Sequence, residues 1–150
     1  MRGACVPKRT HLLLDGFPKG FAKNDHKAVI GNLFAETGSW DWSDGFKGEG
    51  NFDSVWEQFS KSWGFMVNTV MMNNAIVTVD TDNSLVIVTT TMNILLDGGL
   101  ADKKHLVSNN CVFKFSLDES GEKANVWDAF WNNSSAGMKT ALGDISAALA

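Results

Sequence analysis

Asp128 is the first candidate among the acidic residues for a catalytic role. It lies in the segment ANVWDAFWNN, where period-two alternation places Val126, Phe130 and Asn132 on the same side as Asp128. Either side of this strand is a candidate for the buried one. If Asp128 points inward among aromatic residues, desolvation raises its pKa and makes it a candidate general base for a carbon acid. If it points outward, it is an ordinary acid on the flank of a sheet.

Asp41 is the second candidate base because it stands between Trp40 and Trp42. The two indoles offer faces for a flat apolar ligand, with Asp41 at the mouth of a pocket. The alternative is that the tryptophans pack and Asp41 caps the following turn. His105 begins a predicted strand, where it serves as a proton shuttle if it leans over the pocket and is a surface residue if it does not.

Asn109 is the polar residue best placed to orient a ligand, because it alternates in phase with Cys111 and Phe113 on one strand. The competing interpretation is a buried structural amide with hydrogen-bond partners. Asn93 lies among apolar residues on the preceding strand. The full set of predicted ligand-binding residues is Trp40, Trp42, Trp56, Asn93, Asn109, Phe113 and Phe130; the predicted catalytic residues are Asp128, Asp41 and His105.

Composition excludes several other chemistries. The chain has 150 residues, a net charge of −4 and a pI near 5.2, which disfavours a nucleic-acid surface. It has no Tyr, and its two arginines are Arg2 and Arg9, so neither a phenol nor an arginine clamp is available in the body of the domain. No His or Cys residues have metal-ligand spacing, and the glycines lack a phosphate-loop pattern. We therefore expect no metal and no cofactor.

The chain length predicts a single domain, with a loose basic segment over residues 1–10 and the domain over residues 11–150. Cys5 and Cys111 do not form a disulfide framework, and there is no signal peptide and no apolar run of about 18 residues. We therefore expect a cytoplasmic protein that does not span a membrane.

The elements that must position these residues change period along the chain. Helical spacing predicts helices over His11–Lys23, His26–Phe34 and Phe52–Met66, the last with an aromatic stripe typical of a core anchor. Between them we expect a short strand at Gly38–Trp42 and a loop at Ser43–Gly50. Period-two alternation then predicts long antiparallel strands over Val70–Val79, Leu85–Leu96, Leu106–Leu117 and Lys123–Trp131, and a closing helix over Met138–Leu149. This is the α+β pattern of one curved sheet packed on its helices.

The order of these elements resembles the nuclear transport factor 2-like superfamily, and within it the SnoaL-like branch. The resemblance rests on the turn at Lys23–Val29, on Leu33–Glu36 leading into Gly38–Trp42, on Lys47-Gly48 and on the hairpin around Gly121. It covers residues 12–142 and implies a cone-shaped, cystatin-like α+β barrel with a pocket at its open end. It also implies a homodimer formed through the sheet.

Active sites known on this fold are each incomplete in this chain. Ketosteroid isomerase has its base just after the first short strand, where the nearest acid here is Asp41, and its oxyanion Tyr has no counterpart. The Arg of the epoxide hydrolases is missing, and of the two His and Tyr of scytalone dehydratase only His105 is available. The His-His-Ser-Ser stretch of a metal-independent carbonic anhydrase group corresponds to 132–135, which keeps the serines alone.

We therefore expect a protein that binds a small apolar or aromatic molecule. As an enzyme, it would be a cofactor-free isomerase, cyclase or dehydratase that uses carboxylate-assisted proton transfer. The alternative is a non-catalytic ligand-binding or assembly module whose pocket is filled by side chains. A third reading is carbonic-anhydrase-like hydration.

Overall fold

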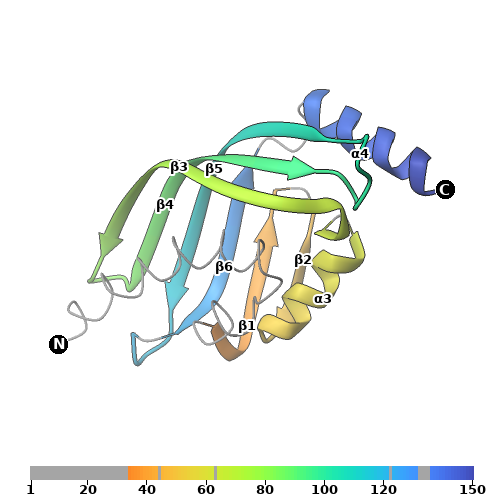
Figure 1. Ribbon diagram of the computed structural model, residues 1–150. Helices are drawn as coiled ribbons and strands as arrows, with labels where there is room; N and C mark the ends of the chain where they lie inside the picture. The colour runs from red at the N-terminus through yellow and green to blue at the C-terminus, as the bar shows by residue number, and fades with distance from the viewer. Residues whose placement is uncertain (1–33, 44, 63, 122, 132–135) are drawn as a thin grey trace.

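The computed structural model describes residues 34–43, 45–62, 64–121, 123–131 and 136–150, which form a mixed α+β domain (Figure 1). The strands are β1 (Phe34–Trp42), β2 (Lys47–Gly50), β3 (Val67–Asp80), β4 (Leu85–Leu96), β5 (His105–Leu117) and β6 (Ala124–Trp131). The helices are α3 (Phe52–Ser62), the 3-10 helix η3 (Gly64–Met66) and α4 (Ala136–Leu149). Within these ranges, no helix has the length and apolar character needed to span a membrane.

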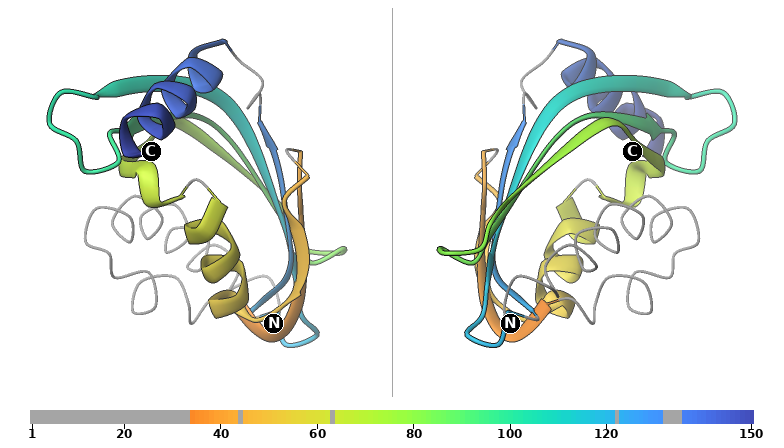
Figure 2. Two further views of the ribbon diagram at one scale, coloured as in Figure 1. Left: turned by 90° about the vertical axis from the view of Figure 1, so that its right-hand side faces the viewer. Right: turned by 90° about the vertical axis from the view of Figure 1, so that its left-hand side faces the viewer.

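The strands form one curved six-stranded sheet in the order β2-β1-β6-β5-β4-β3. The four long strands β3 to β6 make the expected antiparallel meander, while β1 lies parallel to β6. The sheet curves around α3, which lies on its concave side (Figure 2). We call the side that faces α3 the inner face and the opposite side the outer face. This α+β architecture confirms the predicted fold class.

Two expectations for the first hairpin were wrong. β1 begins at Phe34, where the sequence pattern predicts the end of a helix, and residues 47–50 form β2 rather than part of the predicted loop. Gly48 explains the second error, because a Cβ at this position would lie 2.5 Å from Cζ2 of Trp40. The missing side chain lets the Trp40 ring pack across β2, so a glycine that looked like a loop residue belongs to a strand. The predicted N-terminal segment, the domain boundary at residue 11 and the first two helices, apart from Phe34, lie outside the described residues.

Helix α3 begins and ends where its local chemistry requires. Asn51 caps it, because its Oδ1 accepts a hydrogen bond of 3.1 Å from the backbone N–H of Ser54. The helix buries Phe52, Val55 and Phe59 on one side, which confirms the predicted aromatic stripe. At its C-terminus Gly64 leaves room for the Phe59 ring, which any larger residue would displace.

Helix α4 packs at the end of the sheet where β6 stops. β5 pairs with β6 only from Cys111 onward, and α4 contacts β5. Met138, Ala141 and Ile145 are buried in this contact region. Gly98, with φ +59°, lies so close to the helix that a Cβ there would be 2.7 Å from Cγ2 of Ile145.

Candidate functional site

The inner face of the sheet is lined by aromatic residues around Trp42. The Trp42 ring stacks on Phe46 at 4.4 Å and meets Trp127 and Trp131 edge-on at 4.7 and 5.1 Å between ring centres. Trp42 is 4% exposed, and its indole N–H has no hydrogen-bond partner among the described residues. Phe113 is buried on the same face, within 6.4 Å of Trp131. Trp42 and Phe113, two predicted ligand-binding residues, therefore lie together on the inner face.

Trp40 and Trp56 are also on this side of the sheet. The indole N–H of Trp40 donates to Oε1 of Gln58 at 2.9 Å, and Nε2 of Gln58 donates to the backbone carbonyl of Lys47. Gln58 therefore ties α3 to both strands of the first hairpin. Trp56 is partly buried on α3 and packs 5.6 Å from Phe59, measured between ring centres. Both tryptophans have evident packing roles.

A neutral polar band crosses the inner face next to the aromatic residues. It consists of Thr90 on β4 with Asn109 and Cys111 on β5, all buried. Thr90 and Cys111 are register partners, and Cys111 is in turn paired with Trp131. Burial raises the pKa of the Cys111 thiol to about 11, so the thiol stays protonated and is a poor nucleophile. The band can donate and accept hydrogen bonds but carries no charge.

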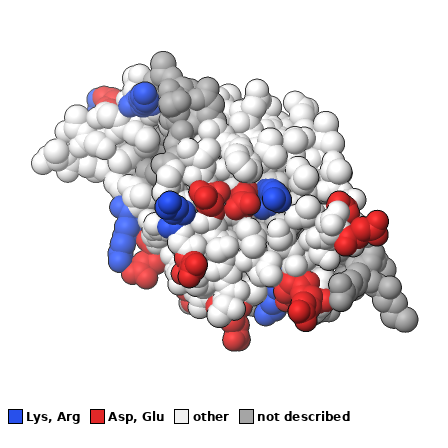
Figure 3. Space-filling model, turned by 180° about the vertical axis from the view of Figure 1, so that it is seen from behind, with Lys and Arg blue, Asp and Glu red and all other residues white. Residues whose placement is uncertain are grey.

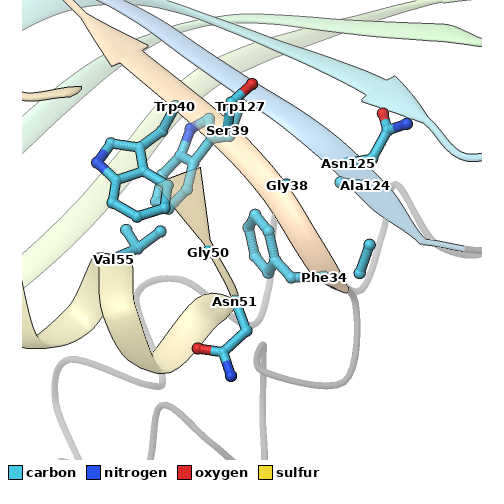
Figure 4. A pocket seen from close by; sticks show the side chains of 11 residues that line it. Phe34, Gly38, Ser39, Trp40, Gly50, Asn51, Val55, Ala124, Asn125 and Trp127 are labelled. Atoms are coloured by element: carbon cyan, nitrogen blue, oxygen red, sulfur yellow. The ribbon is translucent and has the colours of Figure 1, made fainter. Parts of the chain in front are cut away.

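A small cavity lies between β1, β6 and the start of α3. Its volume is about 10 Å³, which leaves room for one water molecule at most. Phe34, Trp40, Val55 and Trp127 supply its apolar walls (Figure 4). This part of the inner face is therefore filled by side chains.

Asp128 and Asp41 are on the outer face. Trp127 and Ala129, on either side of Asp128, are buried in the core, so alternation directs Asp128 away from it. Asp41 lies between buried Trp40 and Trp42 and is exposed. The two acids are register partners on adjacent strands. The inward orientation on which the proposed role of Asp128 depended is not present, and the catalytic assignment of both acids stays a prediction.

The two acids are part of a row of charges across four strands. Lys47 is the register partner of Asp41, and Lys114 is the partner of Asp128, which gives the order Lys47-Asp41-Asp128-Lys114. Seen from behind, a short row of blue and red groups crosses this face, with a largely white area above it and further red and blue groups below it and at its sides (Figure 3). The row therefore borders a largely uncharged part of the outer face.

Asn93 and Phe130 also lie on the outer face. Oδ1 of Asn93 accepts a hydrogen bond from the hydroxyl of Ser108 on β5. Phe130 is 52% exposed and is paired with Val112. Beside Val112 is a shallow hollow of about 290 Å³, also lined by Asn74, Thr89 and Asn110. The structure therefore separates these two predicted ligand-binding residues from the inner-face set.

His105 faces helix α4. Its Nε2 lies 2.8 Å from Oδ2 of Asp144, whose other oxygen accepts from Nζ of Lys103 at 3.0 Å. The hydrogen bond from His105 and then that from Lys103 hold the pKa of Asp144 below its ordinary value. This cluster fastens α4 to the sheet. In the described part of the chain, no three His, Cys, Asp or Glu side chains are grouped so that they could hold a metal ion.

Thr90 is the inner-face residue that the sequence reasoning missed. Thr89 and Thr91, on either side of it, have the same side chain on the opposite face. Its phase with Val88 and Met92 was the available signal, since both are buried in the core. A polar residue in phase with apolar ones marks a buried hydroxyl.

Solved structures share this fold at low sequence identity. A protein assigned as a SnoaL-like polyketide cyclase from Shewanella putrefaciens has a TM-score of 0.65 and 15% identity, covering 92% of this chain and 98% of its own. The pinacolase BvnE from Penicillium brevicompactum has a TM-score of 0.68 and 14% identity, covering 97% and 92%.

The epoxide hydrolase/cyclase-like enzyme SalBIII, of salinomycin pyran ring formation, has a TM-score of 0.62 and 19% identity, covering 89% and 96%. No family model and no curated protein matches the sequence itself. Identities this low establish the fold and leave the activity open. The chain has the nuclear transport factor 2-like fold of the SnoaL-like proteins.

Proposed function

We propose that this protein binds a small, flat, uncharged aromatic molecule against the inner face of its sheet. The observation that carries the proposal is the pairing of an aromatic surface around Trp42 with the neutral polar band of Thr90, Asn109 and Cys111. The described inner-face positions of β4, β5 and β6, from Val86 on β4 to Trp131 on β6, hold no Asp, Glu, Lys or Arg. Such surroundings favour ligands that are apolar apart from a few hydrogen-bonding groups.

The test is a titration with 2-methylnaphthalene followed by amide and indole NMR signals. We expect saturable shifts at residues of the inner face, including the indole N–H of Trp42, and none at Phe130 or Ile76 on the outer face. An absence of saturable shifts, or shifts confined to the outer face, would contradict the proposal. Because Trp42 is already surrounded by aromatic rings, replacing it would test packing rather than binding, so the wild-type chain is used.

Catalysis of proton transfer is the second candidate, and the fold neighbours named as a cyclase and a pinacolase favour it. It is tested by following deuterium exchange at the carbon next to the carbonyl of 2-tetralone, a flat aromatic ketone, in D₂O. If Asp128 is the base, Asp128→Asn abolishes the enzyme-dependent exchange. Because Asp128 is on the outer face, we expect the variant to exchange at the wild-type rate. Exchange by neither protein would leave binding as the function.

We also propose that two copies pair through the outer face. Beyond the charged row, toward the end of the sheet where β6 stops, the described residues on this face are uncharged. They include the exposed residues Phe130, Ile76, Met71 and Leu106. From strand spacing, this surface covers about 500 Å² per copy, close to the smallest area of a specific interface, about 1,000 Å² in total. The charged row then stays at the rim, where solvent screens it.

A further inference from the structure

Thr90 is buried among apolar residues but holds its hydroxyl in a defined hydrogen bond. Its side chain is 6% exposed, between Val88 and Met92 on the inner face of β4. Oγ1 donates to the backbone carbonyl of Asn73 on β3 at 2.9 Å. This carbonyl belongs to an irregular stretch of β3, where the register with β4 shifts between Asn73 and Ile76. The hydroxyl therefore has a fixed orientation.

The hydrogen bond to Asn73 determines which ligand groups Thr90 can recognise. A hydroxyl has one proton to donate and two lone pairs that accept. The carbonyl of Thr91 lies farther away, at 3.4 Å, so the single proton is best placed on Asn73. What remains is an acceptor with no proton of its own to offer. A ligand that contacts this oxygen must donate a proton to it.

The groups beside Thr90 restrict the ligand to its neutral form. Cys111, the register partner of Thr90 on β5, is a protonated thiol, and Trp131 is the register partner of Cys111 on β6. Besides Thr90 and Asn109, the buried polar or charged residues of the described chain include Asp97. Asp97 lies at the end of β4, where Asn68 and Gly99 donate hydrogen bonds to its carboxylate. Among the described residues, the inner-face positions of β4, β5 and β6 hold no Lys or Arg that could stabilise an anion beside Thr90, so a phenolate would lose its hydration without compensation from them.

We infer that Thr90 is a specificity-determining residue that selects neutral aromatic ligands with a hydroxyl group, such as phenols and enols, over their ethers. The inference rests on the proposed binding function and names its ligand class. Thr90 accepts the ligand O–H, while the aromatic residues around Trp42 hold the ring.

The experiment compares the affinities of 2-naphthol and 2-methoxynaphthalene, which have the same ring system and differ in the O–H donor. We expect wild-type protein to bind 2-naphthol about three- to tenfold more tightly, as one net hydrogen bond predicts. Thr90→Val is nearly isosteric and should remove this preference. Thr89→Val makes the same change on the outer face and should keep it. Thr90→Ser keeps a hydroxyl at this position and should keep the preference for 2-naphthol.

The outcomes separate the two claims. If neither naphthalene compound binds the wild-type protein, the proposed function fails. If both bind and the ratio of their affinities is the same in wild type and Thr90→Val, the proposed function stands and the role of Thr90 is refuted. A loss of stability in Thr90→Val does not imitate the expected result. Unfolding lowers the apparent affinities for both ligands by the same factor and leaves the ratio of the two affinities unchanged.

Discussion

At the scale of single residues, Asp41 and Asp128 are side by side on the outer face as register partners. Each aspartate has one like charge and one lysine as its register partners, so at this surface the repulsion between the acids and their attraction to the lysines nearly cancel. The pair is therefore a surface feature whose removal leaves the core untouched.

Asp128→Asn should leave stability unchanged within about 0.5 kcal/mol, because it removes both the repulsion from Asp41 and the attraction to Lys114 on the outer face. Urea denaturation at low and high salt measures this, and the difference from wild type should stay within that limit at both salt concentrations. Asp41→Asn is the matched control and should behave alike. A loss above about 1 kcal/mol would show that Asp128 has a buried partner.

At the scale of elements, close contacts fix the first hairpin and helix α4. Gly48 lies against the Trp40 ring, whereas a Cβ at Gly143 in α4 would meet no atom within 4 Å. The same substitution should therefore have opposite effects at the two positions.

Gly48→Ala should destabilise the domain by about 1–3 kcal/mol, because the Trp40 ring must move out of its position against Gln58. Gly143→Ala should stabilise it by about 0.5–1 kcal/mol through helix propensity. Thermal and urea denaturation of both variants would test this. Equal effects at the two positions would contradict the packing of Trp40 across β2.

The docking of α4 should depend on pH through Asp144. Its pKa is lowered by the hydrogen bonds from His105 and Lys103, so its contribution is complete above the ordinary Asp value of 3.8. The contribution is lost as the pH falls below that value and through the lowered pKa. The protection factors of α4 amides, which correct for the pH dependence of intrinsic exchange, should fall over this range, and Asp144→Asn should have lower protection factors at neutral pH and lose the dependence. An identical pH profile in the variant would exclude this role.

At the scale of the whole molecule, the uncharged part of the outer face predicts a dimer. Light scattering should give twice the chain mass of 16.4 kDa at tens of micromolar protein. Ile76, 66% exposed on this face, is the residue to change: Ile76→Lys should produce a monomer that remains folded. Leu149→Lys, on α4 and away from this face, is the control and should stay dimeric. A monomeric wild-type protein would refute the proposal.

The sequence by itself predicted the four long strands β3 to β6 to within a few residues, and it predicted which of their residues share a face. Leu85–Leu96 was predicted with its observed bounds, because alternation of side chains is a local property of an extended chain. It could not predict β2, because Gly48 is a strand residue only when the Trp40 ring lies across it.

Alternation of side chains also does not show which face of a strand is buried. It placed Asp128 and Phe130 on the same face without deciding whether that face is the inner or the outer one. That choice came from the tertiary structure, where Trp127 and Ala129 pack on the inner face and turn Asp128 outward. For the same reason the sequence put Thr90 in phase with Val88 and Met92, but the neighbouring strands decided that this phase faces the core. Periodicity is encoded within each strand, whereas the direction of the core depends on contacts between residues far apart in the chain.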